Sequence, residues 1–283
     1  MSVLTTIIEY LSNSLIRNVL IVGVLIALCA SLLGTTIVLK RLSFIGDGLS
    51  HVAFGALAVA MVFSLSDTMI LVLPVTIIVA IILMGINDKK MVKGDAAIAM
   101  LSVGALAVGY IALNLFPSKS SGNIAGDVCS TLFGATSIFT LSGMDVVLCI
   151  VLSIAVVLFF VFFYNRIFAV TFDENFASAT GIKCKAYRLL LSIVIAVVIV
   201  LSMQLVGSLL ISALIVFPVL SAERVFRSFI SVVIASGTIG VVCALAGILV
   251  SIPLSTPIGA TVVCVNIIMF VLCAIVGAIF GRK

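Results

Sequence analysis

The chain has 283 residues, of which 64% are hydrophobic and only 9% are charged, and its mean hydropathy is +1.51. Soluble domains contain about 45–50% apolar residues, so the composition excludes a soluble globular protein and indicates a polytopic membrane protein. Apolar runs extend from end to end, so we expect residues 1–283 to form one transmembrane domain. The net charge of +5 is explained better by Lys and Arg flanking membrane spans than by a nucleic-acid partner.

Seven cysteines include no C-x-x-C pair, and most lie within apolar runs. Cysteine in such runs behaves as a small hydrophobic residue, so we interpret them as packing residues. The N-terminus lacks the basic stretch, short apolar core and cleavage site of a signal peptide. Residues 3–15 instead predict a short amphipathic segment that leads into the first span.

Stretches of about 20 mainly apolar residues predict membrane-crossing helices. These stretches lie at 18–39, 45–65, 69–86, 96–116, 144–164, 189–206, 207–222, 229–250 and 257–280. The sixth and seventh come from one long run that is interrupted at Gln204, Gly207 and Ser208, which predicts two helices joined by a tight turn. We therefore expect an all-α bundle of eight or nine membrane helices.

The basic residues orient this bundle. With the N-terminus outside, all but Arg17 and Lys119 of the 15 basic residues lie at inner ends of spans, as the positive-inside rule requires. We therefore expect a multi-pass protein of the cell membrane. Residues 122–143 would lie outside, either as a re-entrant hairpin buried in protein or as a plain external loop.

His51 is the only histidine, and it lies four residues after Asp47 within the second predicted span. Residues four apart share a helix face, so a carboxylate and an imidazole can converge on one cation, a ligand mixture suited to Zn²⁺ or Mn²⁺. Counting helical residues from Arg41, His51 should lie about 15 Å deep, near the midplane. The structural alternative is that Asp47 and His51 pair with each other and hold the bundle together.

Two ligands are fewer than the three or four protein ligands of a tight zinc site. A symmetric dimer would supply both residues twice, and Gly46, Gly48 and Gly55 would let another helix or a second copy approach closely. Asp127 and Gln204 are lesser candidates for a polar path. Asp127 can equally be a solvated loop residue, Gln204 can satisfy backbone groups at the helix break, and Asn266 can hydrogen-bond another helix.

Residues 172–182 predict a short helix between the basic flanks Arg166 and Arg188. Asp173 and Glu174 suit the start of a helix, and Gly181 suits its end. Held parallel to the membrane, this helix could insert into a groove on a soluble partner. It could equally be an interfacial helix that anchors the loop.

Four blocks of sequence resemble a known family. They are RLSFIGDGLSH at 41–51, LFG at 132–134, TFDENFASATG at 171–181 and QLVGSLLISALIVFP at 204–218. Over about residues 17–280 the chain resembles the permease subunits of ATP-binding-cassette (ABC) importers for zinc, manganese and iron. The resemblance implies a type II-like importer fold and a homodimeric pore lined by Asp47 and His51. It also implies an extracellular metal-binding protein and two cytoplasmic ATPase subunits docking on the loop 171–183, through Asp173, Glu174, Phe176, Ala177 and Gly181.

The cargo expected from this resemblance is Zn²⁺, with Mn²⁺ or Fe²⁺ as alternatives. Many manganese-type members carry a proline shortly after the histidine, whereas this chain reads His51-Val-Ala-Phe-Gly55. No permanently bound cofactor is expected.

Other function classes fit the sequence less well. The chain has no G-x-x-x-x-G-K-[ST] phosphate loop, so we expect a permease without enzymatic activity and a separate ATPase. An ion-driven secondary transporter would need further intramembrane acids, and only Asp47 lies deep within a predicted span. A metalloprotease with H-E-x-x-H is excluded by the single histidine.

Overall fold

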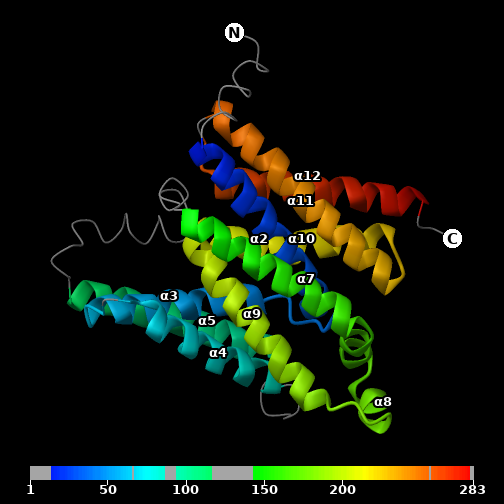
Figure 1. Cartoon of the computed structure of the whole chain (residues 1–283), viewed down its shortest axis with the longest axis horizontal. Coiled ribbons are helices and arrows are strands. Elements are labelled where there is room, and N and C mark those ends of the chain that lie inside the picture. Colours follow the sequence, from blue (N-terminus) through cyan, green and yellow to red (C-terminus); the bar gives the residue numbers. More distant parts are fainter. Residues whose placement is uncertain (1–13, 66, 87–93, 117–142, 255, 281–283) are drawn as a thin grey trace.

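A computed structural model describes the chain except for residues 1–13, 66, 87–93, 117–142, 255 and 281–283 (Figure 1). All regular elements within the described residues are helices. They are α2 (Ser14–Leu39), α3 (Ile45–Val62), α4 (Met69–Ile86), α5 (Gly94–Leu115), α7 (Gly143–Phe172), α8 (Glu174–Ala179), α9 (Cys184–Val206), α10 (Ser208–Val225), α11 (Phe229–Leu254) and α12 (Ile258–Phe280).

Every predicted span is a helix in the structure. Eight helices of the described part are long and apolar enough to cross a membrane, and Met69–Gly85 of α4 is a slightly shorter apolar helix. The all-α membrane bundle predicted from hydropathy is therefore confirmed. The amphipathic segment expected at 3–15 lies almost entirely outside the described residues, as does the segment at 122–143.

Helix α7 continues past the predicted fifth span at 144–164 and ends at Phe172. Arg166 does not break the helix, since a charged side chain can leave the bundle while the backbone keeps its hydrogen bonds. Ile167 and Val170 beyond it are buried again. As a result, only Asp173, the N-cap of α8, separates α7 from α8.

Gly207 separates α9 from α10, as the sequence predicts. Its backbone has φ 96° and ψ 154°, a conformation that is essentially restricted to glycine. The Gly207 N–H still donates to the carbonyl of Met203 at 2.9 Å, so α9 ends in a closed turn. The chain then reverses into α10 without a long loop.

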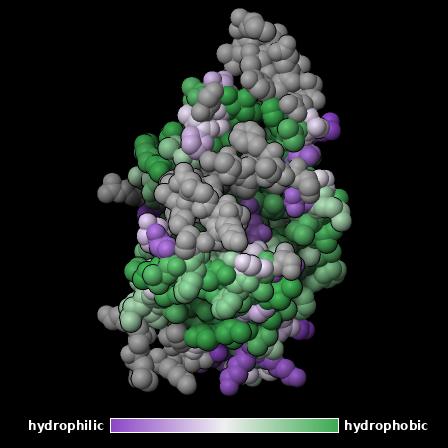
Figure 2. Space-filling view, turned by 90° about the vertical axis from the view of Figure 1, so that its left-hand side faces the viewer, coloured by the Kyte–Doolittle hydropathy of each residue, from purple (hydrophilic) through white to green (hydrophobic). Residues whose placement is uncertain are grey.

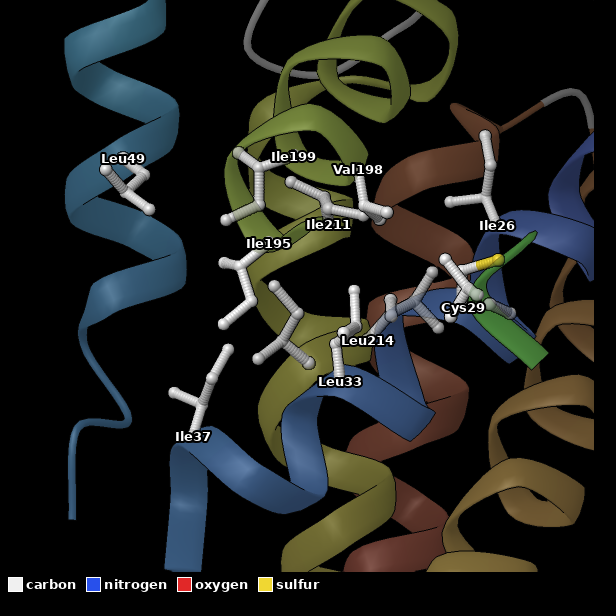
Figure 3. Packing of buried hydrophobic residues seen from close by; sticks show 14 of the residues in the cluster. Ile26, Cys29, Leu33, Ile37, Leu49, Ile195, Val198, Ile199, Ile211 and Leu214 are labelled. Atoms are coloured by element: carbon white, nitrogen blue, oxygen red, sulfur yellow. The ribbon is translucent and has the colours of Figure 1, made fainter. Parts of the chain in front are cut away.

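Helix α2 lies in the middle of the bundle and packs against α7, α9, α10 and α11. Figure 3 shows its side chains meeting residues of α9 and α10. The labelled residues, all buried members of one hydrophobic cluster, are Ile26, Cys29, Leu33 and Ile37 of α2, Leu49 of α3, Ile195, Val198 and Ile199 of α9, and Ile211 and Leu214 of α10. The spacing of the α2 residues by three or four places them along one helical stripe.

The outer helices present apolar side chains to the surroundings. Large hydrophobic residues of α5, α7 and α12 are exposed along the length of each helix, and hydrophobic side chains cover most of the described surface on the side drawn in Figure 2. A monomeric soluble protein does not expose apolar surface of this extent. These faces therefore meet lipid or another protein chain.

Candidate functional site

Asp47 and His51 lie together on α3. Arg41 takes a positive φ of 59° in the turn between α2 and α3, and Asp47 then falls in the first turn of α3. The Nε2 atom of His51 lies 3.4 Å from Oδ1 of Asp47. The prediction that the two side chains share one helix face is confirmed, and the separation is longer than that of a strong charge-assisted hydrogen bond.

The surroundings of the pair differ from those of a sealed structural ion pair. The Asp47 side chain is 51% exposed and the His51 side chain is 21% exposed, while Nδ1 of His51 is buried without a hydrogen-bond partner. A carboxylate on a membrane helix is costly to place against lipid. The face of α3 that carries Asp47 must therefore meet water or another protein chain.

The predicted depth of His51 counts helical residues from Arg41, whereas α3 begins at Ile45. Because residues 41–44 form a turn, the helical rise begins at Ile45, and six residues at about 1.5 Å each place His51 about 9 Å from the start of α3. Val62, where α3 ends, lies about 16 Å further along the helix by the same rise. His51 is thus about one third of the way along α3, and Asp47 lies in its first turn.

The glycines beside the pair are used within the chain itself. A Cβ atom at Gly48 would lie 2.6 Å from Cγ2 of Ile98, and one at Gly55 would lie 2.6 Å from the carbonyl oxygen of Ala105, both on α5. At Gly46 a Cβ atom would lie 2.9 Å from Cδ1 of Ile215 on α10. The close approach predicted at these glycines is therefore made by α5 and α10, which fix α3 and its two polar side chains in the bundle.

Asp47 and His51 are two candidate ligands for a metal ion. Within the described residues no group of three or more His, Cys, Asp or Glu side chains could hold a metal ion. A carboxylate and a neutral imidazole that face water can contact a passing divalent cation, and two ligands favour its release. The arrangement therefore suits a transit site better than a storage site.

The predicted inner-loop helix is present as α8. Asp173 is its N-cap, and Oδ1 of Asp173 accepts a hydrogen bond of 2.9 Å from the N–H of Phe176. At the other end, Gly181 has φ 86°, the Gly181 N–H donates to Ser178 and the Ile182 N–H donates to Ala177. This pair of hydrogen bonds is the Schellman arrangement that ends many helices. The local structure is thus encoded by Asp173 and Gly181.

The side chains proposed for partner docking do not all face outward. Phe176 is 65% exposed, whereas Ala177 is fully buried. Ala177 packs α8 onto the permease, whereas Asn175, Phe176, Ser178 and Ala179 are exposed and available to a partner. The role of α8 in docking remains a prediction.

Glu174 joins α8 to two other helices, which sequence reasoning missed. Its Oε1 lies 3.0 Å from Nζ of Lys40, beside the end of α2, and its Oε2 lies 3.4 Å from Nη1 of Arg188 in α9. Both basic side chains are mostly buried. The sequence places Lys40 and Arg188 at the inner ends of predicted membrane spans. Nothing in their spacing indicates that they form ion pairs with Glu174.

The lesser polar candidates lie apart from the pair or outside the described residues. Gln204 is half-buried in the last turn of α9, three residues before the break at Gly207. Asp127 and the block 132–134 are outside the described part of the chain. The expectation that Asn266 bonds another helix is wrong, because its Nδ2 donates to the carbonyl of Val262 in the same helix at 2.9 Å.

Comparisons with known proteins match this architecture. A family model described as the ABC 3 transport family matches residues 12–277. The manganese import system permease protein ScaB of Streptococcus gordonii is 26% identical over 255 residues, which are 90% of this chain and 88% of the relative. The high-affinity zinc uptake system membrane protein ZnuB of Haemophilus influenzae is 26% identical over 253 residues, 89% of this chain and 94% of the relative.

A solved structure also matches. PsaBC from Streptococcus pneumoniae in complex with Fab superimposes with a TM-score of 0.81 and 26% sequence identity, over 95% of each chain. The family model covers nearly the whole chain, and the nine apolar helices of the described part lie almost entirely within the matched residues. The protein therefore belongs to the ABC 3 transport family, as a multi-pass plasma-membrane permease subunit whose transport is driven by ATP hydrolysis on a separate chain.

Proposed function

We propose that this permease imports divalent transition-metal ions and that Asp47 and His51 are the transit ligands. The observation that carries the proposal is the position of Nε2 of the only histidine, 3.4 Å from a carboxylate oxygen that faces away from the protomer. Imidazole and carboxylate together suit Zn²⁺ and Mn²⁺. The permease itself needs no chemistry beyond holding and releasing the ion.

A homodimer would complete this site. One chain offers two ligands, and its exposed Asp47 needs water or a second protein surface rather than lipid. Two copies facing each other would bring two carboxylates and two imidazoles to one path. Four ligands shared across an interface that opens and closes would bind the ion in one state and release it in another.

The finer proposal concerns the ion, which we take to be Zn²⁺. It is supported by the run His51-Val-Ala-Phe-Gly55, which lacks the proline of many manganese-type members. The names of the relatives include both a manganese and a zinc system, so Mn²⁺ fits the family equally well. A direct comparison of the two ions decides between them.

The ATPase partner would bind α8 from the cytoplasmic side. Phe176 offers an exposed aromatic side chain on a helix held by its own caps, and Glu174 ties that helix to Lys40 and Arg188. Movement of α8 would therefore reach the end of α2 and the turn that leads into Asp47. An extracellular metal-binding protein would deliver the ion, and alternating access around the pair would complete transport.

The test is metal uptake by the complete permease and ATPase complex in liposomes, with Zn²⁺ and Mn²⁺ compared. We expect Asp47→Asn and His51→Ala to assemble with the ATPase but to lose uptake at least tenfold. The matched control is Asp67→Asn, because Asp67 lies in the loop after α3, where it accepts a hydrogen bond from the N–H of Met69. Uptake that survives in both site variants would remove the pair from the path, and selectivity for Mn²⁺ would reject the zinc proposal.

The partner proposal has a separate test. Phe176→Ala should weaken co-purification of the ATPase, whereas Phe162→Ala, on a side chain that is 77% exposed along α7, should not. Ala177→Arg is a poor probe because Ala177 is buried and the change would displace α8 itself. Metal uptake by the permease alone in liposomes would contradict the ATP-driven mechanism and favour a secondary transporter.

A further inference from the structure

A groove at the charged end of the bundle lies between α7, the turn after α8, and α9. Figure 1 shows α7 and α9 running together toward α8. The groove has a volume of about 630 Å³. It is lined by Phe163 and Arg166 of α7, Thr180, Gly181, Ile182 and Lys183 of the connecting turn, and Ala186, Tyr187 and Leu190 of α9.

The lining carries two cations and no acid. Arg166 and Lys183 are both exposed, and neither Asp nor Glu is among the lining residues. The neighbouring cavity beside Lys40 and Arg188 is different, because Glu174 forms part of its wall and pairs with both of these bases. Among the described lining residues, the α7–α9 groove therefore has two positive charges with no acid to balance them, which favours an anionic ligand.

Arg166 is already held in place for such a ligand. Its guanidinium carbon lies 5.4 Å from the ring centroid of Tyr187, and its Nη1 donates a hydrogen bond to the Tyr187 hydroxyl. The Tyr187 ring in turn packs against Phe163 with ring centroids 5.8 Å apart. Because guanidinium has five donors in a rigid fork, the remaining donors of Arg166 stay available, and so does the hydroxyl hydrogen of Tyr187.

The position of the groove relative to the apolar helix faces indicates which kind of anion it binds. Toward the membrane, α7 exposes Leu158, Val161 and Phe162, and α9 exposes Leu189 and Leu190. Toward the cytoplasm, α7 leads directly into α8. Arg166 and Lys183 thus lie where an apolar helix face gives way to the charged end of the bundle, which is the level of lipid headgroups at the inner leaflet.

We propose that the α7–α9 groove binds an anionic phospholipid. The phosphate accepts hydrogen bonds from Arg166, Lys183 and Tyr187, and the acyl chains lie along the exposed apolar side chains of α7 and α9. Basic pockets between membrane helices on the cytoplasmic side bind headgroups of this class. Since the same groove includes the turn that ends α8, the bound lipid holds the base of this helix against α7 and α9.

The test is lipid binding to the purified full-length chain, measured by native mass spectrometry and by thermal stability in detergent. The probes are phosphatidylglycerol, phosphatidylcholine and inorganic phosphate. The variant is R166Q/K183Q, and the control is R41Q/K185Q, which removes the same charge at the same end of the bundle outside the groove. We expect phosphatidylglycerol to bind the original chain and the control, and the groove variant to bind it at least tenfold more weakly.

A second measurement tests the proposal even if the groove variant misfolds. Phosphatidylglycerol binding to the unaltered chain should weaken as the salt concentration rises from about 0.1 M to about 1 M, because the screening length falls from about 10 Å to about 3 Å. The charge-retaining variant R166K/K183R should keep binding. Equal binding of phosphatidylcholine, binding unaffected by R166Q/K183Q, or the same stabilisation by inorganic phosphate alone would each overturn the lipid site. None of these readouts depends on metal transport.

Discussion

The ammonium nitrogen of Lys40 lies 3.0 Å from Oε1 of Glu174, although the two residues are 134 positions apart in the chain. Lys40 follows α2 directly and precedes the turn into α3, where Asp47 lies, and Glu174 opens α8. The contact therefore connects the proposed ATPase-docking helix to the helix that carries the proposed metal ligands. Arg188 completes it from α9, so one carboxylate ties three helices together.

Breaking this contact should separate ATP hydrolysis from transport. In Lys40→Met the Glu174 carboxylate keeps only Arg188, so α8 can move without pulling the end of α2. We expect the complex to retain most of its ATPase activity and to transport several-fold fewer ions for each ATP hydrolysed. The measurement is metal uptake and phosphate release on the same liposomes.

A charge exchange provides the control for that variant. The double variant K40E/E174K restores an opposite pair at the same positions and should recover part of the lost coupling, whereas Glu174→Lys alone should not. If the exchange and the single variant transport equally poorly, the attraction between the two side chains is not what connects the helices.

The N-cap of α8 should be required for docking of the ATPase. Asp173→Ala removes the hydrogen bond of 2.9 Å to the Phe176 N–H, and loss of such a cap costs about 1 kcal/mol. In a helix of six residues this is enough to increase local opening several-fold. Faster amide hydrogen exchange across 174–179 should accompany weaker ATPase binding, and Asp173→Ser should restore both. Unchanged amide hydrogen exchange across 174–179 in Asp173→Ala would contradict a stabilising role of this N-cap.

The close contact of α2 with α10 at Gly34 should not tolerate a side chain at this position. A Cβ atom there would lie 2.1 Å from the carbonyl oxygen of Ile215, and a backbone atom cannot rotate away. We expect Gly34→Ala to destabilise the bundle by about 1–3 kcal/mol, as overpacking does. The control is Gly85→Ala in α4, where a Cβ atom would meet nothing within 4 Å. Thermal denaturation in detergent compares the two, and equal midpoints would reject the tight α2–α10 contact.

The break between α9 and α10 should depend on glycine. At φ 96° and ψ 154° an alanine at position 207 would be strained by about 1–3 kcal/mol. Gly207→Ala should therefore lower the midpoint of thermal denaturation and reduce the yield of the folded permease. Gly85→Ala again serves as the control, since Gly85 lies within a helix and has no positive φ. A Gly207→Ala protein as stable as its parent would show that the turn can relax at no cost.

The sequence by itself determined the helices, because the signals that define them are local. Runs of apolar residues predicted the spans from α2 to α12, the interruption at Gly207 predicted the α9–α10 break, and the pair Asp173 and Gly181 predicted both ends of α8. The spacing of Asp47 and His51 likewise placed them on one helix face. The helix bounds differ from the predicted spans by only a few residues, as in α7, which continues past Arg166 to Phe172.

Only the tertiary structure decided which helices meet. The sequence of a helix that is apolar on nearly every side does not indicate which helices pack against it. It therefore could not predict that Gly48 and Gly55 contact α5 or that Gly34 contacts α10. It could not pair Lys40 with Glu174 or Arg166 with Tyr187, since each pair joins different helices. The exposure of the Asp47 side chain likewise depends on which helices pack around α3. Hydropathy places a residue in the membrane, but the packing of neighbouring helices decides whether its side chain faces lipid, protein or the path of an ion.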